Sequence, residues 1–328
     1  MHPIQRLKEI WRARSRPGRR DSGGRLALAL QGGGALGAFT WGVLDRLLET
    51  PGFRFAGVSG ASAGAVNAVV LAAAWAEGGA PASRQALDRV WQRISEAARL
   101  PPFGLQPYQS VPGFGPAAGA LALDVTTRLV SPYQFNPLAL HPLREILAET
   151  VDFAALTAPA CPPVVIAATR IADGTARLFG NAEITLDTVL ASAALPSLNH
   201  AVEIEGEAYW DGGYVANPPL RALVAAARPD ALLVVQLNPL RDDRLPRQAP
   251  DIVARLNQIV FNRPLLDELA FLAETRPGLP VHRLVIDAEH PALQLGSALS
   301  LDLPFLQTLR QHGREKAADF LAGGVTGR

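Results

Sequence analysis

The amino-acid sequence predicts a three-layer α/β/α fold around a mainly parallel central sheet, and two observations lead to that prediction. The chain opens with a strand, a helix, a second strand and a second helix, expected at residues 26–30, 38–49, 53–58 and 63–76. This order implies parallel strands joined by crossover helices. Further alternation follows without a linker-like change of composition, which favours one domain over residues 25–328.

The first elements follow from their apolar runs. Leu26–Leu30 is a short apolar run before a glycine cluster, which is typical of a buried strand. The longest apolar run, Ala65–Ala76, has 12 residues and includes Asn67. A helix that spans a bilayer needs about 20 apolar residues, so we expect a buried helix here.

Regular elements continue on both sides of an irregular insertion. Residues 101–142 are rich in Pro and Gly with interleaved aromatic residues, and we expect them to form a lid or one wall of an acyl-chain pocket. The other expected elements are helices at 83–100, 186–194, 251–272 and 303–321, and strands at 164–171, 232–237 and 283–286.

A basic tail precedes the domain at residues 1–24. Seven of its first twenty residues are Arg or Lys, against one Glu, and four apolar residues stand at helical spacing: Ile4, Leu7, Ile10 and Trp11. This pattern fits either an amphipathic segment that contacts an anionic membrane surface or a solvated tail. The tail contains no apolar signal-peptide core, so we expect a cytoplasmic protein, either free or peripheral at the membrane.

The composition excludes several classes of function. The formal net charge is +1, which gives no attraction of the whole molecule to nucleic acid. Cys161 is the single cysteine, and the six histidines are scattered without the spacing of a metal-binding pair. We therefore expect no metal, no cofactor and no nucleic-acid partner.

A glycine-rich loop follows the first strand. Gly32, Gly34 and Gly37 form a G-x-G-x-x-G between a strand and a helix, an arrangement that holds the pyrophosphate of a dinucleotide in some proteins. That interpretation requires an acidic residue about 20 positions further on. The second strand instead ends in FAGVSGASAG, without Asp or Glu, so we expect the loop to stabilise a different negative charge.

The second strand is followed by a candidate nucleophile. The G-x-S-x-G at residues 60–64 stands on a strand-to-helix turn, where side chains at Gly60 and Gly64 would crowd a tight backbone. A serine that attacks an ester creates an oxyanion, which needs N–H donors fixed beforehand. A glycine loop at a helix N-terminus offers such donors, so Ser62 and the loop together predict an acyl hydrolase.

This serine needs a proton acceptor, because a hydroxyl is a poor nucleophile until a base takes its proton. Asp211 is the candidate, since Gly212 and Gly213 after it allow a tight turn that would project the carboxylate. Burial beside Trp210 and Tyr214 would raise its pKa from an ordinary value of about 3.9 toward neutrality.

The three motifs, in this order and at this spacing, resemble the patatin-like phospholipase family. The likeness extends over residues 26–240, and segments such as ASAALPSLNHAVEIEGEAYWDGGYVANPPLRAL and VVQLNPL resemble a bacterial branch of it. The resemblance implies a patatin-like fold and a serine acyl hydrolase of carboxylic esters, with a Ser–Asp dyad and no catalytic histidine.

The resemblance also assigns roles to individual residues. Ser62 would be the nucleophile and Asp211 the proton acceptor of a phospholipase A-like enzyme whose partner is a lipid or another acyl ester. The oxyanion loop would comprise Gly32, Gly33, Gly34 and Gly37, with the N–H groups of Gly33 and Gly34 as donors. Many family members carry Lys or Arg at the fifth loop position, where this chain has Leu36, so a cation that would assist phosphate binding is missing.

Two other interpretations stay open at this point. An esterase of the α/β-hydrolase type would use a Ser–Asp–His triad, and both His282 and His290 follow Asp211 in the order that such a triad requires. His282 directly precedes the strand expected at 283–286, and His290 stands in a turn-like segment. A non-catalytic protein would use the same fold only to bind a lipid or another partner.

Overall fold

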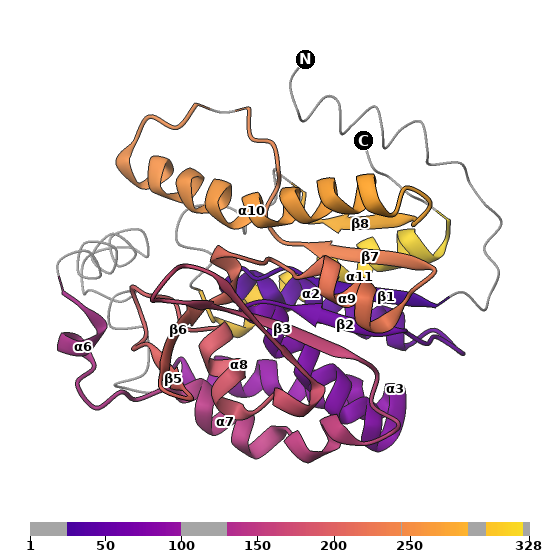
Figure 1. The fold of residues 1–328 in the computed structure, drawn as a ribbon, viewed down its shortest axis with the longest axis horizontal. Coiled ribbons are helices and arrows are strands. Elements are labelled where there is room, and N and C mark those ends of the chain that lie inside the picture. Colours follow the sequence, from indigo (N-terminus) through magenta and orange to yellow (C-terminus); the bar gives the residue numbers. More distant parts are fainter. Residues whose placement is uncertain (1–24, 100–129, 244, 288–299, 324–328) are drawn as a thin grey trace.

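The computed structural model describes residues 25–99, 130–243, 245–287 and 300–323 (Figure 1). The basic tail at 1–24, most of the insertion expected at 101–142, and His290 lie outside these residues. The described end of the insertion contains the one-turn helix α6 (Pro132–Phe135). Tyr133 anchors this helix, because its ring lies 4.1 Å from the ring of His200 and its hydroxyl accepts the N–H of Ala201 at 3.1 Å.

An eight-stranded mixed sheet runs through the described part of the chain, with the order β5-β6-β3-β2-β1-β7-β8 and with β4 paired to β3. The pairs β3–β2, β2–β1, β1–β7 and β7–β8 are parallel, whereas β4 and β6 pair antiparallel with β3, and β5 with β6. The strands are β1 (Leu26–Leu30), β2 (Gly57–Gly60), β3 (Val164–Arg170), β4 (Ala176–Gly180), β5 (Val202–Ile204), β6 (Glu207–Asp211), β7 (Ala231–Gln236) and β8 (Val281–Val285).

Helices cover both faces of this sheet, which confirms the predicted three-layer α/β/α fold (Figure 1). The larger core lies under α2 (Gly37–Leu48), α3 (Ala63–Ala97), α7 (Pro142–Thr150), α8 (Leu186–Ser192) and α11 (Leu303–Leu321). The smaller core lies under α9 (Leu220–Ala227) and α10 (Ala249–Thr275). Short 3-10 turns occur at Gly34–Leu36, Phe153–Thr157, Asn181–Glu183 and Gly212–Tyr214.

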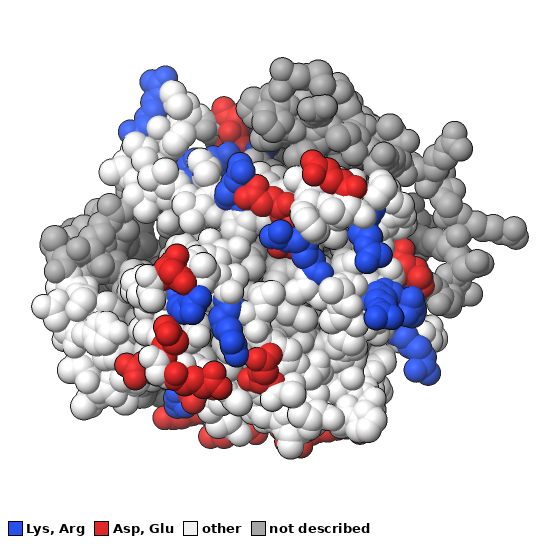
Figure 2. All heavy atoms as spheres, in the orientation of Figure 1, with Lys and Arg blue, Asp and Glu red and all other residues white. Residues whose placement is uncertain are grey.

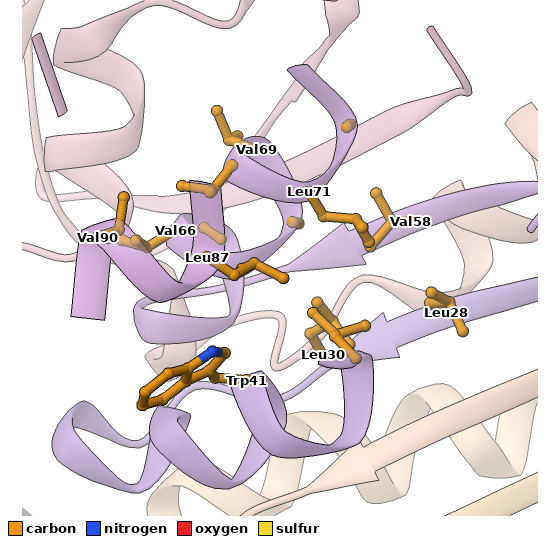
Figure 3. Close-up of a cluster of buried hydrophobic side chains, with 14 of the residues drawn as sticks. Leu28, Leu30, Trp41, Val58, Val66, Val69, Leu71, Leu87 and Val90 are labelled. Atoms are coloured by element: carbon orange, nitrogen blue, oxygen red, sulfur yellow. The ribbon is translucent and has the colours of Figure 1, made fainter. Parts of the chain in front are cut away.

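Strand β1 shows how the two cores are separated. Successive side chains of a strand project to opposite faces. Leu28 and Leu30 therefore enter the larger core, where Figure 3 shows Leu30 nearer than Leu28 to Trp41 of α2, while Ala27 and Ala29 face the smaller core. The small side chains on that second face let α9 pack close to the sheet.

Three predicted elements differ in the structure. The strand expected at 53–58 is displaced, because pairing with β1 begins only at the Ala27–Gly57 pair and continues to Gly60. The helices expected at 63–76 and 83–100 form the single element α3, which is interrupted where Gly78 and Gly79 leave the helical conformation. Strands β4, β5 and β6 were not predicted, since they are short and contain no continuous apolar run.

Helix α3 has the length and composition of a membrane-spanning helix but is mostly buried in the protein. Among the described helices it is the one that is long and apolar enough to cross a bilayer, with a mean hydropathy of 1.2 in its most apolar window. In the structure 61% of that window is buried inside the protein. Figure 3 shows Val66, Val69 and Leu71 of this helix directed into the larger core.

An ion cluster joins α2, α3 and α11 around Asp45. The side chain of Asp45 is 3% exposed and accepts hydrogen bonds from Arg84 at 2.7 Å, from Arg310 at 2.9 Å and from Arg314. Glu49, which follows the last residue of α2, pairs with Arg84 and Arg314, each at 2.8 Å. Asp45 is thus a buried carboxylate with several cationic partners.

Candidate active site

Ser62 stands on a strained turn between β2 and α3. Its backbone angles are φ 56° and ψ −130°, a conformation that side-chain-bearing residues rarely adopt. The flanking glycines are required, because a Cβ at Gly60 would lie 2.2 Å from the carbonyl oxygen of Gly64, and one at Gly64 would lie 2.1 Å from that of Leu30. This geometry is typical of a nucleophile elbow, which presents a serine hydroxyl at the end of a strand.

The glycine loop packs directly on this turn. A Cβ at Gly32 would lie 2.6 Å from the Cβ of Ser62, and a Cβ at Gly37 would lie 2.7 Å from that of Ala63. The loop therefore reaches its observed position only without side chains at these two residues. The structure brings the two predicted motifs into contact.

The N–H groups of the loop divide into two kinds. The N–H of Gly32 donates to Oδ1 of Asn217 at 2.7 Å, and that of Gly37 donates to the carbonyl oxygen of Gly34. Within the described part of the chain, no partner is found for the N–H groups of Gly33, Gly34 and Ala63. Gly32 and Gly37 thus shape the loop, and the other three N–H groups are free to meet an oxyanion.

The sheet topology brings Asp211 to Ser62. Strand β4 pairs with residues 165–169 along one edge of β3. Strand β2 pairs with residues 164–166 and strand β6 with residues 168–170, so both must lie along the other edge of β3, one after the other. These two strands run toward each other, because β2 is parallel and β6 antiparallel to β3. Gly60 ends β2 opposite Ile166 and Asp211 ends β6 opposite Ala168, so the ends are roughly 7 Å apart along β3.

Asp211 is a fully buried carboxyl group with one unpartnered oxygen. Its Oδ1 accepts the N–H of Gly213 at 2.7 Å, whereas Oδ2 has no hydrogen-bond partner in the described part of the chain. Burial raises the pKa of Asp211 to about 7, although the nearby Ser62 side chain and the Gly213 N–H act to lower it. A carboxyl with this pKa and a free oxygen beside a hydroxyl is suited to proton transfer.

The turn after Asp211 depends on its two glycines. A Cβ at Gly212 would lie 2.0 Å from the carbonyl oxygen of Ala167, and one at Gly213 would lie 2.5 Å from the ring of Phe261. Tyr214 follows with its ring 5.0 Å from that of Phe261, and burial together with the charge of Asp211 raises the pKa of Tyr214 to about 12. Phe261 of α10 therefore lies against the Asp211 turn.

Ser192, the last residue of α8, and Ala194, two residues further on, support both predicted catalytic residues, and the sequence analysis did not identify them. The N–H of Ser62 donates to the carbonyl oxygen of Ser192 at 3.0 Å and to its hydroxyl at 3.1 Å. The N–H of Asp211 donates to the carbonyl oxygen of Ala194 at 2.9 Å. These residues belong to the segment ASAALP, which carried the family resemblance, but two of the three acceptors are backbone carbonyl oxygens, which any residue type would supply.

A network of amides holds the glycine loop, and it too was not predicted. Asn217 accepts the Gly32 N–H and donates through Nδ2 to the carbonyl oxygen of Phe261 at 3.0 Å. Gln31 donates to Oδ1 of Asn262 at 3.0 Å, and its Oε1 accepts the N–H of Leu237 at 2.7 Å. The buried amides of Gln31, Asn217 and Asn262 thus tie the loop to α10.

The one triad histidine that the structure describes is far from Ser62. His282 lies in β8, which is separated from β2 by β1 and β7. Strands are about 4.8 Å apart, so three strand spacings put these two strands about 14 Å apart. The ring of His282 packs against Phe320 at 5.4 Å. Among the described residues, no group of three or more His, Cys, Asp or Glu side chains is arranged to hold a metal ion.

A serine on a strained strand-to-helix turn beside a glycine loop is typical of enzymes that transfer acyl groups. The family model for patatin-like phospholipases matches residues 28–224, which is more than half of the chain. The chain therefore belongs to the patatin-like phospholipase family, whose members are lipid hydrolases, and the family predicted from the motifs is confirmed.

Solved structures give a more distant likeness. VipD from Legionella pneumophila matches with 14% identity and a TM-score of 0.46, over 94% of this chain and 70% of VipD. The ExoU–SpcU complex of the type III secretion system of Pseudomonas aeruginosa matches with 14% identity and a TM-score of 0.42, over 92% of this chain and 52% of that one. No curated protein sequence matches this chain.

Proposed function

We propose that the protein is a lipid acyl hydrolase of the phospholipase A type, which cleaves carboxylic esters with Ser62 as nucleophile and Asp211 as proton acceptor. The observation that carries the proposal is the buried carboxyl of Asp211, whose Oδ2 lacks a hydrogen-bond partner among the described residues while Ser62 lies beside it. Membership of the patatin-like phospholipase family supports the substrate class.

The first chemical step is attack of the Ser62 Oγ on the ester carbonyl carbon. The hydroxyl proton passes to Oδ2 of Asp211, because that oxygen is free while Oδ1 is occupied by the Gly213 N–H. With a pKa of about 7, Asp211 is substantially ionised at neutral pH and still basic enough to hold the proton.

The glycine loop stabilises the charge that develops on the carbonyl oxygen. The N–H groups of Gly33 and Gly34, which have no partner in the part of the chain that the structure describes, are fixed before the reaction, since Asn217 and Gln31 hold the preceding residues in place. The N–H of Ala63, at the start of α3, is a third candidate donor that the sequence analysis did not name. One such donor contributes roughly 2.7–4 kcal/mol to transition-state stabilisation.

Collapse of the tetrahedral intermediate expels the alcohol, which takes the proton from Asp211, and leaves an acyl group on Ser62. Water then attacks the acyl-enzyme and gives its proton to Asp211, and the returning proton frees Ser62 with release of a fatty acid. The same carboxyl serves both half-reactions, so the scheme requires no histidine. The about 14 Å between β2 and β8 argues against His282 as a third member.

The test is hydrolysis of a graded series of p-nitrophenyl esters, from acetate to palmitate, by the wild type and Ser62→Ala. Ser59→Ala is the matched control, because this serine lies in β2, just before the turn that carries Ser62, and its buried hydroxyl has no partner in the described part of the chain. We expect turnover and labelling by a fluorophosphonate in the wild type and the control, and neither in Ser62→Ala. Labelling and turnover that persist in Ser62→Ala would refute the assignment, and a wild type that binds lipid without turnover would identify a binding protein.

A further inference from the structure

Asn217 is a fully buried asparagine whose side chain joins the glycine loop to α10. Its Oδ1 accepts the N–H of Gly32 at 2.7 Å, and its Nδ2 donates to the carbonyl oxygen of Phe261 at 3.0 Å. The oxygen and nitrogen of an amide group are held in one plane at a fixed separation. The position of the Phe261 carbonyl therefore restricts where the Gly32 N–H group lies.

The bond at Gly32 bears on catalysis because this residue directly precedes the two candidate oxyanion donors, Gly33 and Gly34. A run of glycines loses much conformational freedom when it is ordered, so it needs fixed points outside itself. Gly34 adopts a φ of 58°, in the left-handed region. The N–H of Leu36 closes the turn on the carbonyl oxygen of Gly33 at 3.2 Å, and Asn217 fixes the start of the run.

Gln31 gives the loop a second link to α10. Its Oε1 accepts the N–H groups of Leu237 at 2.7 Å and Asn238 at 3.0 Å. The side chain of Leu237 packs on Gly33, where a Cβ would lie 3.2 Å from its Cδ1. The Nε2 of Gln31 donates to Oδ1 of Asn262 at 3.0 Å. The surface against which Gly33 rests is thus also tied to the helix.

The two links end on consecutive residues of α10, Phe261 and Asn262. The second half of this helix is anchored in the smaller core by Leu265, Leu269 and Leu272. The family model matches residues 28–224, and α10 lies beyond them. The position of the glycine loop in this chain therefore depends on a helix outside the family match.

Both links are made by uncharged side chains. Figure 2 shows Lys, Arg, Asp and Glu side chains interspersed on the face of the molecule in view, whereas the buried links consist of the amides of Gln31, Asn217 and Asn262. An amide donates and accepts hydrogen bonds without adding a charge. This property suits a site where negative charge develops on the substrate, since a fixed charge nearby would oppose it or shift the pKa of the proton acceptor.

We propose that Asn217 is a positioning residue for the reaction, because it ties the Gly32 N–H to α10 and so aims the N–H groups of Gly33 and Gly34 at the oxyanion. Asn262 supports the same loop through Gln31. The inference rests on the proposed function, since the oxyanion forms only when Ser62 attacks an ester. Loss of either asparagine should weaken transition-state stabilisation and leave substrate binding unchanged.

The test variants are Asn217→Ala and Asn262→Ala, and Asn181→Ala is the matched control. Asn181 has the same bonding pattern as Asn217, since its Oδ1 accepts the N–H of Val164 at 2.8 Å and its Nδ2 donates to the carbonyl oxygen of Leu156 at 2.9 Å. Val164 begins β3, whereas Ser62 follows the other end of the parallel strand β2. The control thus breaks similar bonds away from the candidate site.

Two quantities are measured on each protein: kcat and KM for p-nitrophenyl butyrate, and the inhibition constant Ki of an alkyl trifluoromethyl ketone. The Ser62 Oγ adds to the carbonyl carbon of this ketone, its proton passes to Asp211, and the carbonyl oxygen becomes an oxyanion beside the loop. In Asn217→Ala we expect kcat to fall about a hundredfold and Ki to rise by a similar factor, as for a lost oxyanion donor. In Asn262→Ala we expect about tenfold in both, because the displacement is passed on through Gln31. KM should stay unchanged in both variants, and the control should keep the wild-type kcat and Ki.

The Ki separates positioning from folding, because an unfolded fraction lowers the apparent kcat but leaves the Ki of the remaining active enzyme unchanged. A wild-type Ki in Asn217→Ala, even with a lower kcat, would overturn the proposal. The same would follow if Asn181→Ala lost kcat and raised Ki as much as Asn217→Ala. A wild type without turnover of any ester would refute the proposed function and this inference with it. Wild-type turnover with unchanged Ki in both test variants would refute this inference alone.

Discussion

Two buried aspartates in this protein have opposite electrostatic environments. Asp45 and Asp211 are 2% and 0% exposed as whole residues, so both carboxyl groups have lost most of their contact with water. Three arginines surround Asp45, whereas Asp211 has the backbone N–H of Gly213 and the hydroxyl of Ser62. The comparison isolates the effect of a counter-charge on a buried acid.

The two pKa values move in opposite directions. Burial alone would raise the pKa of Asp45, but the hydrogen bond from Arg84 and the charges of Arg310 and Arg84 outweigh it and leave the pKa below its ordinary value. Burial raises the pKa of Asp211 to about 7, because no such charges oppose it. Burial thus raises the pKa of an aspartate into the range of a useful base only where no cation lies next to it. Asp45, with its three arginines, instead joins the helices that carry them.

The largest expected effect comes from removing the acid in the candidate site. Asp211→Asn should lower kcat on p-nitrophenyl esters by at least about a thousandfold, because Asn cannot accept the serine proton. Asp45→Asn is the control and should retain wild-type kcat for the folded protein. Comparable loss in both variants, measured on samples with the same circular dichroism, would show that Asp211 has no special role.

The second prediction concerns stability at the ion cluster. Asp45→Asn should destabilise the fold by about 2–3 kcal/mol, because it leaves partly buried arginines without their counter-charge. The folded-state pKa of Asp45 lies below the unfolded value, so its contribution is complete above that unfolded value and is lost as the pH falls through the folded pKa. Thermal unfolding should therefore show a constant deficit from pH 5 to 8, and a deficit that grows toward acid pH would contradict this account.

Asp211→Asn should have the opposite effect on stability. The folded-state pKa of about 7 lies above the unfolded value of 3.8, so the wild type loses stability as the pH rises between these two values. The variant carries no charge to bury and should be more stable by about 1–2 kcal/mol at pH 8, as expected where activity and stability conflict. The difference in Tm between Asp211→Asn and the wild type should disappear near pH 4. A Tm of the variant below that of the wild type at pH 8 would contradict this prediction.

The smallest predicted effect is on the pH dependence of the reaction. Only ionised Asp211 accepts a proton, so kcat/KM should rise with pH through about 7. Between pH 6 and pH 8 the expected increase is about tenfold, from the ionised fraction alone. A profile that is flat over this range would remove Asp211 as the titrating base, and the Asp45→Asn variant should give the wild-type profile.

Much of the fold was predictable because its signals are local. The apolar runs of β1, β3 and β7 and the helix at Leu303–Leu321 lie where the sequence places them, since a buried strand or helix needs such runs wherever it packs. Strands β5 and β6 carry no such run and gain their stability from pairing with β3. Their positions depend on a partner distant in sequence.

Some features of the candidate site could likewise be predicted from the sequence, and others could not. By itself the sequence determined the identities of Ser62, Asp211 and the glycines around them, because a strained turn or a close backbone contact tolerates few residue types. Only the tertiary structure decided that the Gly32 N–H donates to Asn217 while the N–H groups of Gly33 and Gly34 have no partner among the described residues. It also decided that Asp211 is buried with no arginine charge acting on its pKa. Hydrogen-bond partners and local charge depend on which distant segments meet, and at this site that depends on β2 and β6 meeting along one edge of β3.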